Sequence, residues 1–177
     1  TTITTPYALT APVVVTRGSS QGNILPNISV SGATIVVSGN HTSTEFYVGE
    51  RYSMTYEFSE PTLKEPTATG GRVAITGGRL QIKHWLLRYQ DSGDFTVKIQ
   101  QKGSSTSKDY VFTGFVVGDG TSTLGANALT SGDFKFPVMS KADRIRVIIE
   151  SNSHLPCQFL SAEWEGNMHL RSRRVNG

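Results

Sequence analysis

Two glutamates flank a tryptophan near the end of this 177-residue chain, and paired carboxylates beside an aromatic ring are typical of glycoside hydrolases. Glu163 and Glu165 stand two residues apart around Trp164. In an extended strand both acids would point to one face, about 7 Å apart, and the tryptophan to the other. That spacing is compatible with an inverting enzyme, whose carboxyl groups lie about 6.5–9.5 Å apart. A catalytic pair must nevertheless flank the scissile bond, so we predict instead a core-facing Trp164 between acids that face solvent or a partner.

Metal ligands are the second chemistry to consider. Asp91 and Asp94 in the stretch DSGD could serve calcium, but the alternating oxygen ligands and the distal glutamate of a calcium loop are missing. A neighbouring side chain is expected to satisfy His84, which lies within a predicted strand. The four histidines show no metal-ligand spacing: His41, His84, His154 and His169. We therefore expect no metal site.

The sequence contains no motif typical of a serine nucleophile or of a phosphate-binding loop. No G-x-S-x-G motif occurs, and neither GGRVAITGG nor VGDGTSTLG is followed by the residues of a phosphate loop. The single cysteine, Cys157, lies among apolar neighbours and is predicted to be a small core residue. We expect no catalytic residue, no cofactor and no enzymatic activity.

Three arginines within four positions remain as the candidate interaction site: Arg171, Arg173 and Arg174. Arginine pairs with carboxylates as readily as with phosphates and is common at protein interfaces. A solvated terminus, a subunit contact and a nucleic-acid contact are the three readings. A net charge of +3 is small for a nucleic-acid binder, so we take these arginines as a candidate subunit interface.

The elements that must position these residues are strands. Apolar and polar residues alternate with a period of two in residues 51–58, 94–100 and 143–150, which indicates half-buried strands. No stretch combines helical periodicity with helix caps. A content of 18 glycines suits many tight turns. The sequence predicts an all-β protein, an antiparallel β-sandwich of jelly-roll-like type.

Three local features refine this prediction. The stretch YQDSGDF, residues 89–95, has the residues of a tight hairpin between two strong strands. Pro137 argues for an edge strand or a bulge. A turn is predicted at Gly166 and Asn167, after the strand that carries Trp164.

The composition divides the chain near residue 45. Residues 1–44 are rich in Ser, Thr, Gly and Val and contain no acid, whereas later strands are longer, more aromatic and more charged. We predict a small N-terminal β module at 1–44, the end of a larger preceding region, and a main β-sandwich at 45–177. The chain begins without Met, which suggests a fragment, and no apolar run is long enough for a membrane segment.

A family resemblance rests on three stretches. These are FYVGERYSMTYEFSEP, GGRLQIKHWLLRYQDSGDFTVKI, and the region from SGDFKFPV through SAEWEGNMHLRSRRV. In order and spacing, about residues 45 to 175 resemble the C-terminal part of the tail tubular protein B family, the nozzle proteins of short-tailed bacteriophages (podophages). The resemblance implies a structural virion protein located in the phage tail, without catalytic residues. It also implies a hexameric ring beneath the adaptor ring (tail tubular protein A) and the portal, with tail fibres as candidate neighbours and genomic DNA passing through the lumen during ejection.

Two alternatives stay open at this point. Tryptophans such as Trp85 or Trp164, if exposed on a jelly-roll-like scaffold, would fit a carbohydrate-binding module. A hydrolase is the weaker alternative, since no constellation of residues supports it.

Overall fold

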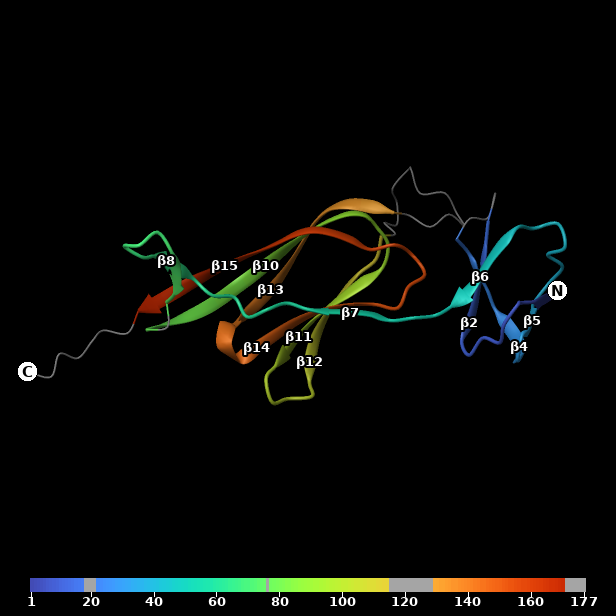
Figure 1. Cartoon of the computed structure of the whole chain (residues 1–177), viewed down its shortest axis with the longest axis horizontal. Coiled ribbons are helices and arrows are strands. Elements are labelled where there is room, and N and C mark those ends of the chain that lie inside the picture. Colours follow the sequence, from blue (N-terminus) through green and yellow to red (C-terminus); the bar gives the residue numbers. More distant parts are fainter. Residues whose placement is uncertain (18–21, 76, 115–128, 171–177) are drawn as a thin grey trace, which may run out of the picture.

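The computed structural model describes residues 1–17, 22–75, 77–114 and 129–170. Within these ranges the chain is built almost entirely of antiparallel strands, which confirms the predicted all-β class. Figure 1 shows two parts lying end to end, an N-terminal module and a larger sandwich. No helix in the described ranges is long and apolar enough to cross a membrane.

The N-terminal module consists of two small three-stranded sheets, ordered β1-β5-β4 and β3-β2-β6. Val14, Ile35 and Val37 are at most 1% exposed and form its core with Ile3 and Leu9. Its strands are β1 (Thr2–Thr4), β2 (Pro12–Thr16), β3 (Ile24–Leu25), β4 (Asn27–Ser31), β5 (Thr34–Val37) and β6 (Phe46–Glu50).

Strand β6 lies beyond the predicted boundary at residue 45, yet it pairs with β2 from Pro12–Glu50 to Thr16–Phe46. Phe46 and Val48 pack against the N-terminal core. The change from one set of sheets to the other therefore falls between Glu50 and Met54. That the two parts are independent domains stays a prediction.

The sandwich consists of a three-stranded sheet, β13-β10-β15, and a four-stranded sheet, β12-β11-β14-β7. A separate hairpin, β8-β9, lies near the end of the molecule where β10 begins (Figure 1). The strands are β7 (Met54–Glu57), β8 (Lys64–Pro66), β9 (Arg72–Ala74), β10 (Gly78–Ser92), β11 (Phe95–Gln101), β12 (Ser107–Phe112), β13 (Thr130–Lys141), β14 (Ile145–Ser151) and β15 (Gln158–Leu170). A short 3-10 helix, η1 (Ala142–Arg144), joins β13 to β14.

The strand order is that of a jelly roll without its first strand. Along the chain, the strands from β7 to β15 that form the sandwich alternate between the two sheets, except that β11 and β12 are neighbours within one sheet. An eight-stranded jelly roll has the same order, with one further strand beside its last strand. The predicted jelly-roll-like sandwich is confirmed, and it has seven strands in the described residues.

Apolar side chains of the two sheets meet in one core. Ile82, Leu87, Phe95 and Phe136 are at most 2% exposed. Aromatic rings join the sheets: the ring of Phe95 on β11 meets the ring of Phe134 on β13 edge to face, with centroids 5.6 Å apart.

The alternating burial of β11 is what the period-two pattern predicted. In β14 the predicted inward residues Ile145, Val147 and Ile149 are buried, but Ile148 between them is buried as well.

The stretch YQDSGDF does not form the predicted hairpin. It is the corner at which the chain leaves one sheet and enters the other, because β10 pairs with β13 and β15 whereas β11 pairs with β12 and β14. Asp91 has a φ of 43° within a register shift between β10 and β13, which bends the strand. Ser92 secures the corner, since its Oγ accepts a hydrogen bond from the Gln158 backbone N–H at 2.9 Å.

The predicted turn at Gly166 and Asn167 is also wrong, because β15 continues through both residues to Leu170. Gly166 has a different role. A Cβ on it would lie 2.5 Å from the backbone oxygen of Gln81, where a register shift brings β10 close to β15. The glycine is required by close strand contact.

The prediction for Pro137 is confirmed. Pro137 lies on β13, an edge strand, beside a register shift. The shift includes Met139, whose φ of 50° lies in the left-handed region.

Candidate functional site

The paired acids lie on β15 as predicted, with Glu163 and Glu165 exposed and Trp164 turned inward. Trp164 pairs in register with Trp85, which is 3% exposed. Because directly opposed residues of an antiparallel pair share a face, both tryptophans face the core. Neither ring offers the exposed platform on which the carbohydrate-binding alternative depended.

Glu165 is occupied by two neighbours on β10. His84 Nε2 lies 3.1 Å from one carboxylate oxygen of Glu165, and Lys83 Nζ lies 3.5 Å from the other. The prediction that a neighbour satisfies His84 is therefore confirmed. The acids do not face one another across a cleft, and they form an exposed polar row on the outer face of the sheet.

Three further ion pairs neutralise cations on the outer faces of the sandwich. Arg88 Nε lies 2.9 Å from Asp133, Lys98 Nζ lies 2.6 Å from Glu150, and Arg146 contacts both carboxylate oxygens of Glu57.

Two of these contacts lower the pKa of the carboxyl group that they hold. The Arg146 guanidinium, through its hydrogen bonds, holds the pKa of Glu57 below its ordinary value. Arg88 does the same for the pKa of Asp133. Each carboxylate therefore stays charged beside its cation down to a lower pH than a free side chain would.

The candidate arginines Arg171, Arg173 and Arg174 lie outside the described residues. They follow Leu170, the last residue of β15, which lies at the end of the sandwich that also carries the β8-β9 hairpin (Figure 1).

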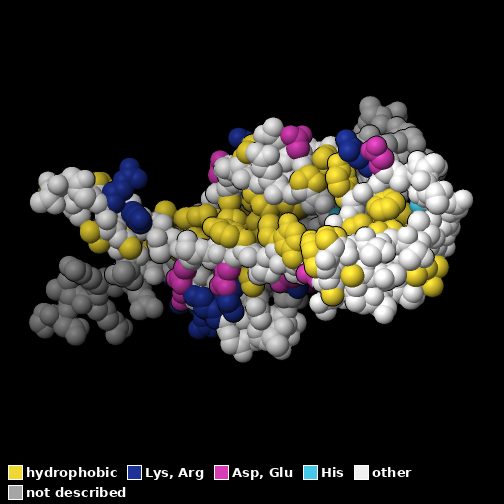
Figure 2. Space-filling view, turned by 45° about the vertical axis from the view of Figure 1, so that its right-hand side comes forward, with side chains coloured by type: hydrophobic (Ala, Val, Ile, Leu, Met, Phe, Trp, Pro, Cys, Tyr) yellow, Lys and Arg dark blue, Asp and Glu magenta, His cyan; other side chains and the backbone are white. Residues whose placement is uncertain are grey.

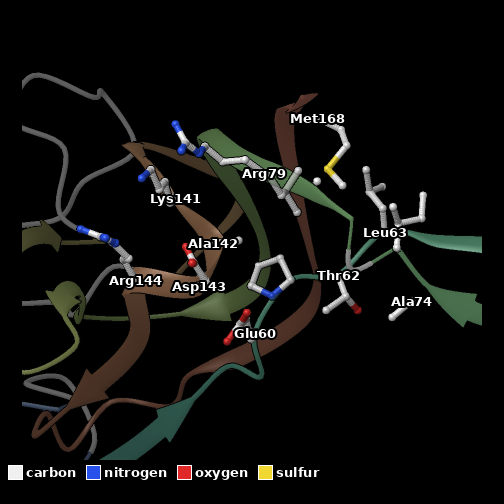
Figure 3. Close-up of a pocket in the computed structure, with 14 residues that line it drawn as sticks. Glu60, Thr62, Leu63, Ala74, Arg79, Lys141, Ala142, Asp143, Arg144 and Met168 are labelled. Carbon is white, nitrogen blue, oxygen red and sulfur yellow. The ribbon is translucent and has the colours of Figure 1, made fainter. Parts of the chain in front are cut away.

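A pocket of about 410 Å³ opens beside this end of β15. Its cations come from two regions far apart in the sequence. Arg79 lies at the start of β10, whereas Lys141 ends β13 and Arg144 belongs to the adjoining η1. In the described part of the chain none of the three has a salt bridge. Figure 3 shows Arg79 and Lys141 reaching to the same side, with Asp143 and Glu60 below them and Met168 and Leu63 at the apolar end.

Sequence reasoning missed this pocket because its cations lie about 60 positions apart and only the strand pairing brings them together. Glu60 is held by Lys102, whose Nζ lies 2.7 Å from it. Among the described residues, the pocket thus has three cations without a salt bridge and one carboxylate without one, Asp143, a charge balance that suits acidic side chains of a neighbouring protein surface.

The possible metal ligands and Cys157 have structural roles in the sandwich. The ranges that the structure describes contain no group of three or more His, Cys, Asp or Glu residues that could hold a metal ion. The backbone oxygen of Asp94 accepts a hydrogen bond from Ser151 Oγ at 2.8 Å, a contact that secures the corner. Cys157 is half-buried against the sandwich core, and burial raises the pKa of its thiol.

Comparison with known protein families shows to which family this chain belongs. The family described as bacteriophage nozzle protein matches residues 1–175. This chain belongs to the bacteriophage nozzle protein family. It is 30% identical over 139 residues to the tail tubular protein gp12 of Escherichia phage T7, a match that covers 78% of this chain and 17% of the relative.

Membership of the nozzle family confirms the resemblance drawn from the sequence and places the protein among the structural proteins of the virion tail. The chain spans less than a fifth of the length of its T7 relative. The nozzle family gives no support to the carbohydrate-binding alternative.

Proposed function

We propose that this chain is the C-terminal part of a longer nozzle protein and forms one rigid wall element of a homo-oligomeric ring, hexameric in the complete tail. The ring carries the tail adaptor protein on one side, has tail fibres as further neighbours, and lets the genome pass through its lumen. The observation that carries the proposal is the family match over residues 1–175. A sandwich with two sheets and one continuous apolar core supports it, because such a unit resists deformation.

Passage of DNA requires a surface that does not hold phosphates, since each neutralised phosphate adds salt-dependent affinity. The ion pairs on the sandwich faces support this role, because Arg88, Lys98 and Arg146 are each already bound to a carboxylate. We expect only weak, sequence-independent DNA binding that vanishes at physiological salt. Electrophoretic mobility shifts at low and physiological salt measure it, and tight binding at physiological salt would contradict the proposal.

The protein is proposed to have no enzymatic activity. Support comes from the acid pair, whose side chains share one outer face of β15 and in which Glu165 is bound by Lys83 and His84. A panel of glycoside substrates tests the point, and turnover that is lost in Glu163→Gln would overturn it.

The arginine-rich end is proposed as a subunit contact. Reversing the charge of Arg171 and Arg173 to Glu in the full-length protein should weaken ring assembly, because two attractive cations become repulsive. Negative-stain electron microscopy and size-exclusion chromatography measure the fraction of rings. Arg72→Glu on β9 is the matched control, and an unchanged ring in the double variant would refute the assignment.

A further inference from the structure

The two edges of the sheet β13-β10-β15 differ in a way that bears on assembly. On β13, Pro137 lacks a backbone N–H, Met139 breaks the register, and the Tyr110 hydroxyl donates a hydrogen bond to the Pro137 carbonyl at 2.8 Å. Proline, bulges and capped groups are the means by which proteins block an edge. The edge of β13 is therefore closed to further pairing.

The edge of β15 is open. Among the described residues β15 pairs with β10 alone. From Ser161 to Leu170 it contains no proline and no residue in the left-handed region. Such an edge presents a row of unpaired backbone N–H and C=O groups, which is a template for another strand.

Tyr56 indicates that no strand of the described ranges fills the space beside this edge. It pairs in register with Ile149, which is 1% exposed and belongs to the core. Directly opposed residues share a face, so Tyr56 points toward the other sheet. It is nevertheless 56% exposed, because none of the strands that the structure describes in the other sheet lies opposite β7.

The vacant position is that of the missing jelly-roll strand, beside β15 and opposite β7. Figure 2 shows hydrophobic side chains gathered in a band along the sandwich. In a jelly roll the first strand comes directly before the strand that β7 represents. In this chain that place in the sequence is held by β6, which pairs with β2 instead.

We propose that an extended strand of a second copy of the protein adds to the free edge of β15 and completes the sandwich. The inference rests on the proposed homo-oligomeric role. The chain's own strand before β7 is committed to β2, and the connection from Glu50 to Met54 is too short to supply another. The relative from phage T7 is several times longer than this chain, so each copy has ample further chain to donate.

The chemistry of the site defines the incoming strand. Its inward residues cover Tyr56, Phe58 and Trp164, so they are apolar and recur with a period of two. On the outer face Glu163 has no salt bridge within the described ranges, whereas Glu165 has Lys83. A lysine or arginine of the incoming strand fits beside Glu163. A contact between unlike surfaces of identical copies closes into a ring when the rotation between copies permits it.

Photo-cross-linking tests the proposal in the full-length protein. Rings are assembled from equal amounts of ¹⁴N- and ¹⁵N-labelled copies that carry Tyr56→p-benzoyl-phenylalanine. The expected result is cross-linked peptides that join light and heavy chains through one extended segment. The control places the same cross-linker at Val111, an exposed residue on the opposite edge strand β12, and should not capture that segment.

Each other outcome overturns the inference. Rings whose cross-links join only chains of the same label would assign the site to the protein's own chain and leave the proposed function standing. Cross-links that appear only in complete tails would assign it to another tail protein. Failure to form rings at all would overturn both proposals.

A substitution provides an independent measurement. Tyr56→Asp should weaken ring association about tenfold, as loss of one apolar anchor at an interface does. It also removes the edge-to-face contact with Phe58, whose ring centroid lies 5.0 Å away, so a small loss of sandwich stability is expected beside the larger loss of association. Tyr52→Asp, at a tyrosine 77% exposed outside β7, is the matched control. Equal association of both variants would contradict the proposal.

Discussion

At the scale of the residue, Gly166 is constrained by space rather than by a turn. A Cβ at this position would meet the backbone oxygen of Gln81 at 2.5 Å, and backbone yields less readily than a side chain. Gly166→Ala should therefore lower the free energy of unfolding by about 1–3 kcal/mol, as overpacking typically does. Urea denaturation measures the loss. Gly49→Ala, where nothing lies within 4 Å of the added Cβ, is the control, and equal stability of the two variants would argue against the close contact.

The surroundings of Cys157 determine how fast its thiol should react. Burial raises the pKa of its thiol, and its Sγ lies 3.5 Å from the backbone oxygen of Asp94. The thiolate is the reactive form, so the folded protein should react with Ellman's reagent at pH 8 several times more slowly than the protein unfolded in urea. Equal rates in both states would show that the thiol is freely accessible.

At the scale of the element, β7 is an edge strand attached to β14 by four backbone pairs and by the Glu57–Arg146 ion pair. Arg146 lowers the pKa of Glu57 in the folded protein. A carboxyl group with a lowered folded pKa contributes stability above its unfolded pKa, and this contribution is lost as the pH falls through the folded value. The pair therefore stabilises β7 at neutral pH and ceases to do so in acid.

Glu57→Gln should accordingly unfold at a slightly lower temperature than the wild-type protein at pH 7, and the difference should shrink as the pH falls below the ordinary glutamate pKa. Because both side chains are exposed, the effect is small. Differential scanning calorimetry across this pH range measures it. Glu65→Gln on the β8-β9 hairpin serves as control, and a difference that grows in acid would contradict the assigned sign.

The elements also show how far sequence reasoning reaches. Period-two alternation identified the strands around Met54, Phe95 and Ile145, because burial on one face leaves its mark on every second residue. It could not assign strands to sheets. Asp91 and Gly93 suit a hairpin and a corner equally well, and only the pairing of β10 and β11 with different partners distinguishes them.

The candidate interaction sites likewise depend on which strands pair with one another. The exposure of Tyr56 follows from a strand that is missing opposite it, and the cations of the pocket meet only because β10 and β13 pair. Neither arrangement leaves a local pattern in the sequence. Sequence reasoning did place Trp164 inward and its flanking acids outward, since that choice depends on one strand alone.

At the scale of the whole molecule, two cores lie end to end. One contains Val14 and Ile35, and the other contains Leu87 and Phe95. A hydrogen bond between His154 Nε2 and the Gly22 carbonyl, 2.7 Å long, crosses the junction. Separate cores with few contacts between them are typical of parts that fold independently.

This arrangement predicts how the chain tolerates truncation. A variant comprising residues 51–177 removes whole sheets and should unfold cooperatively as a soluble protein. A variant comprising residues 45–177, cut at the boundary drawn from composition, keeps β6 without β2 and exposes Phe46 and Val48. Because an unpaired apolar strand associates with other chains, we expect this longer variant to aggregate. Size-exclusion chromatography and thermal unfolding compare the two, and a shorter variant without a cooperative transition would show that both parts fold as one unit.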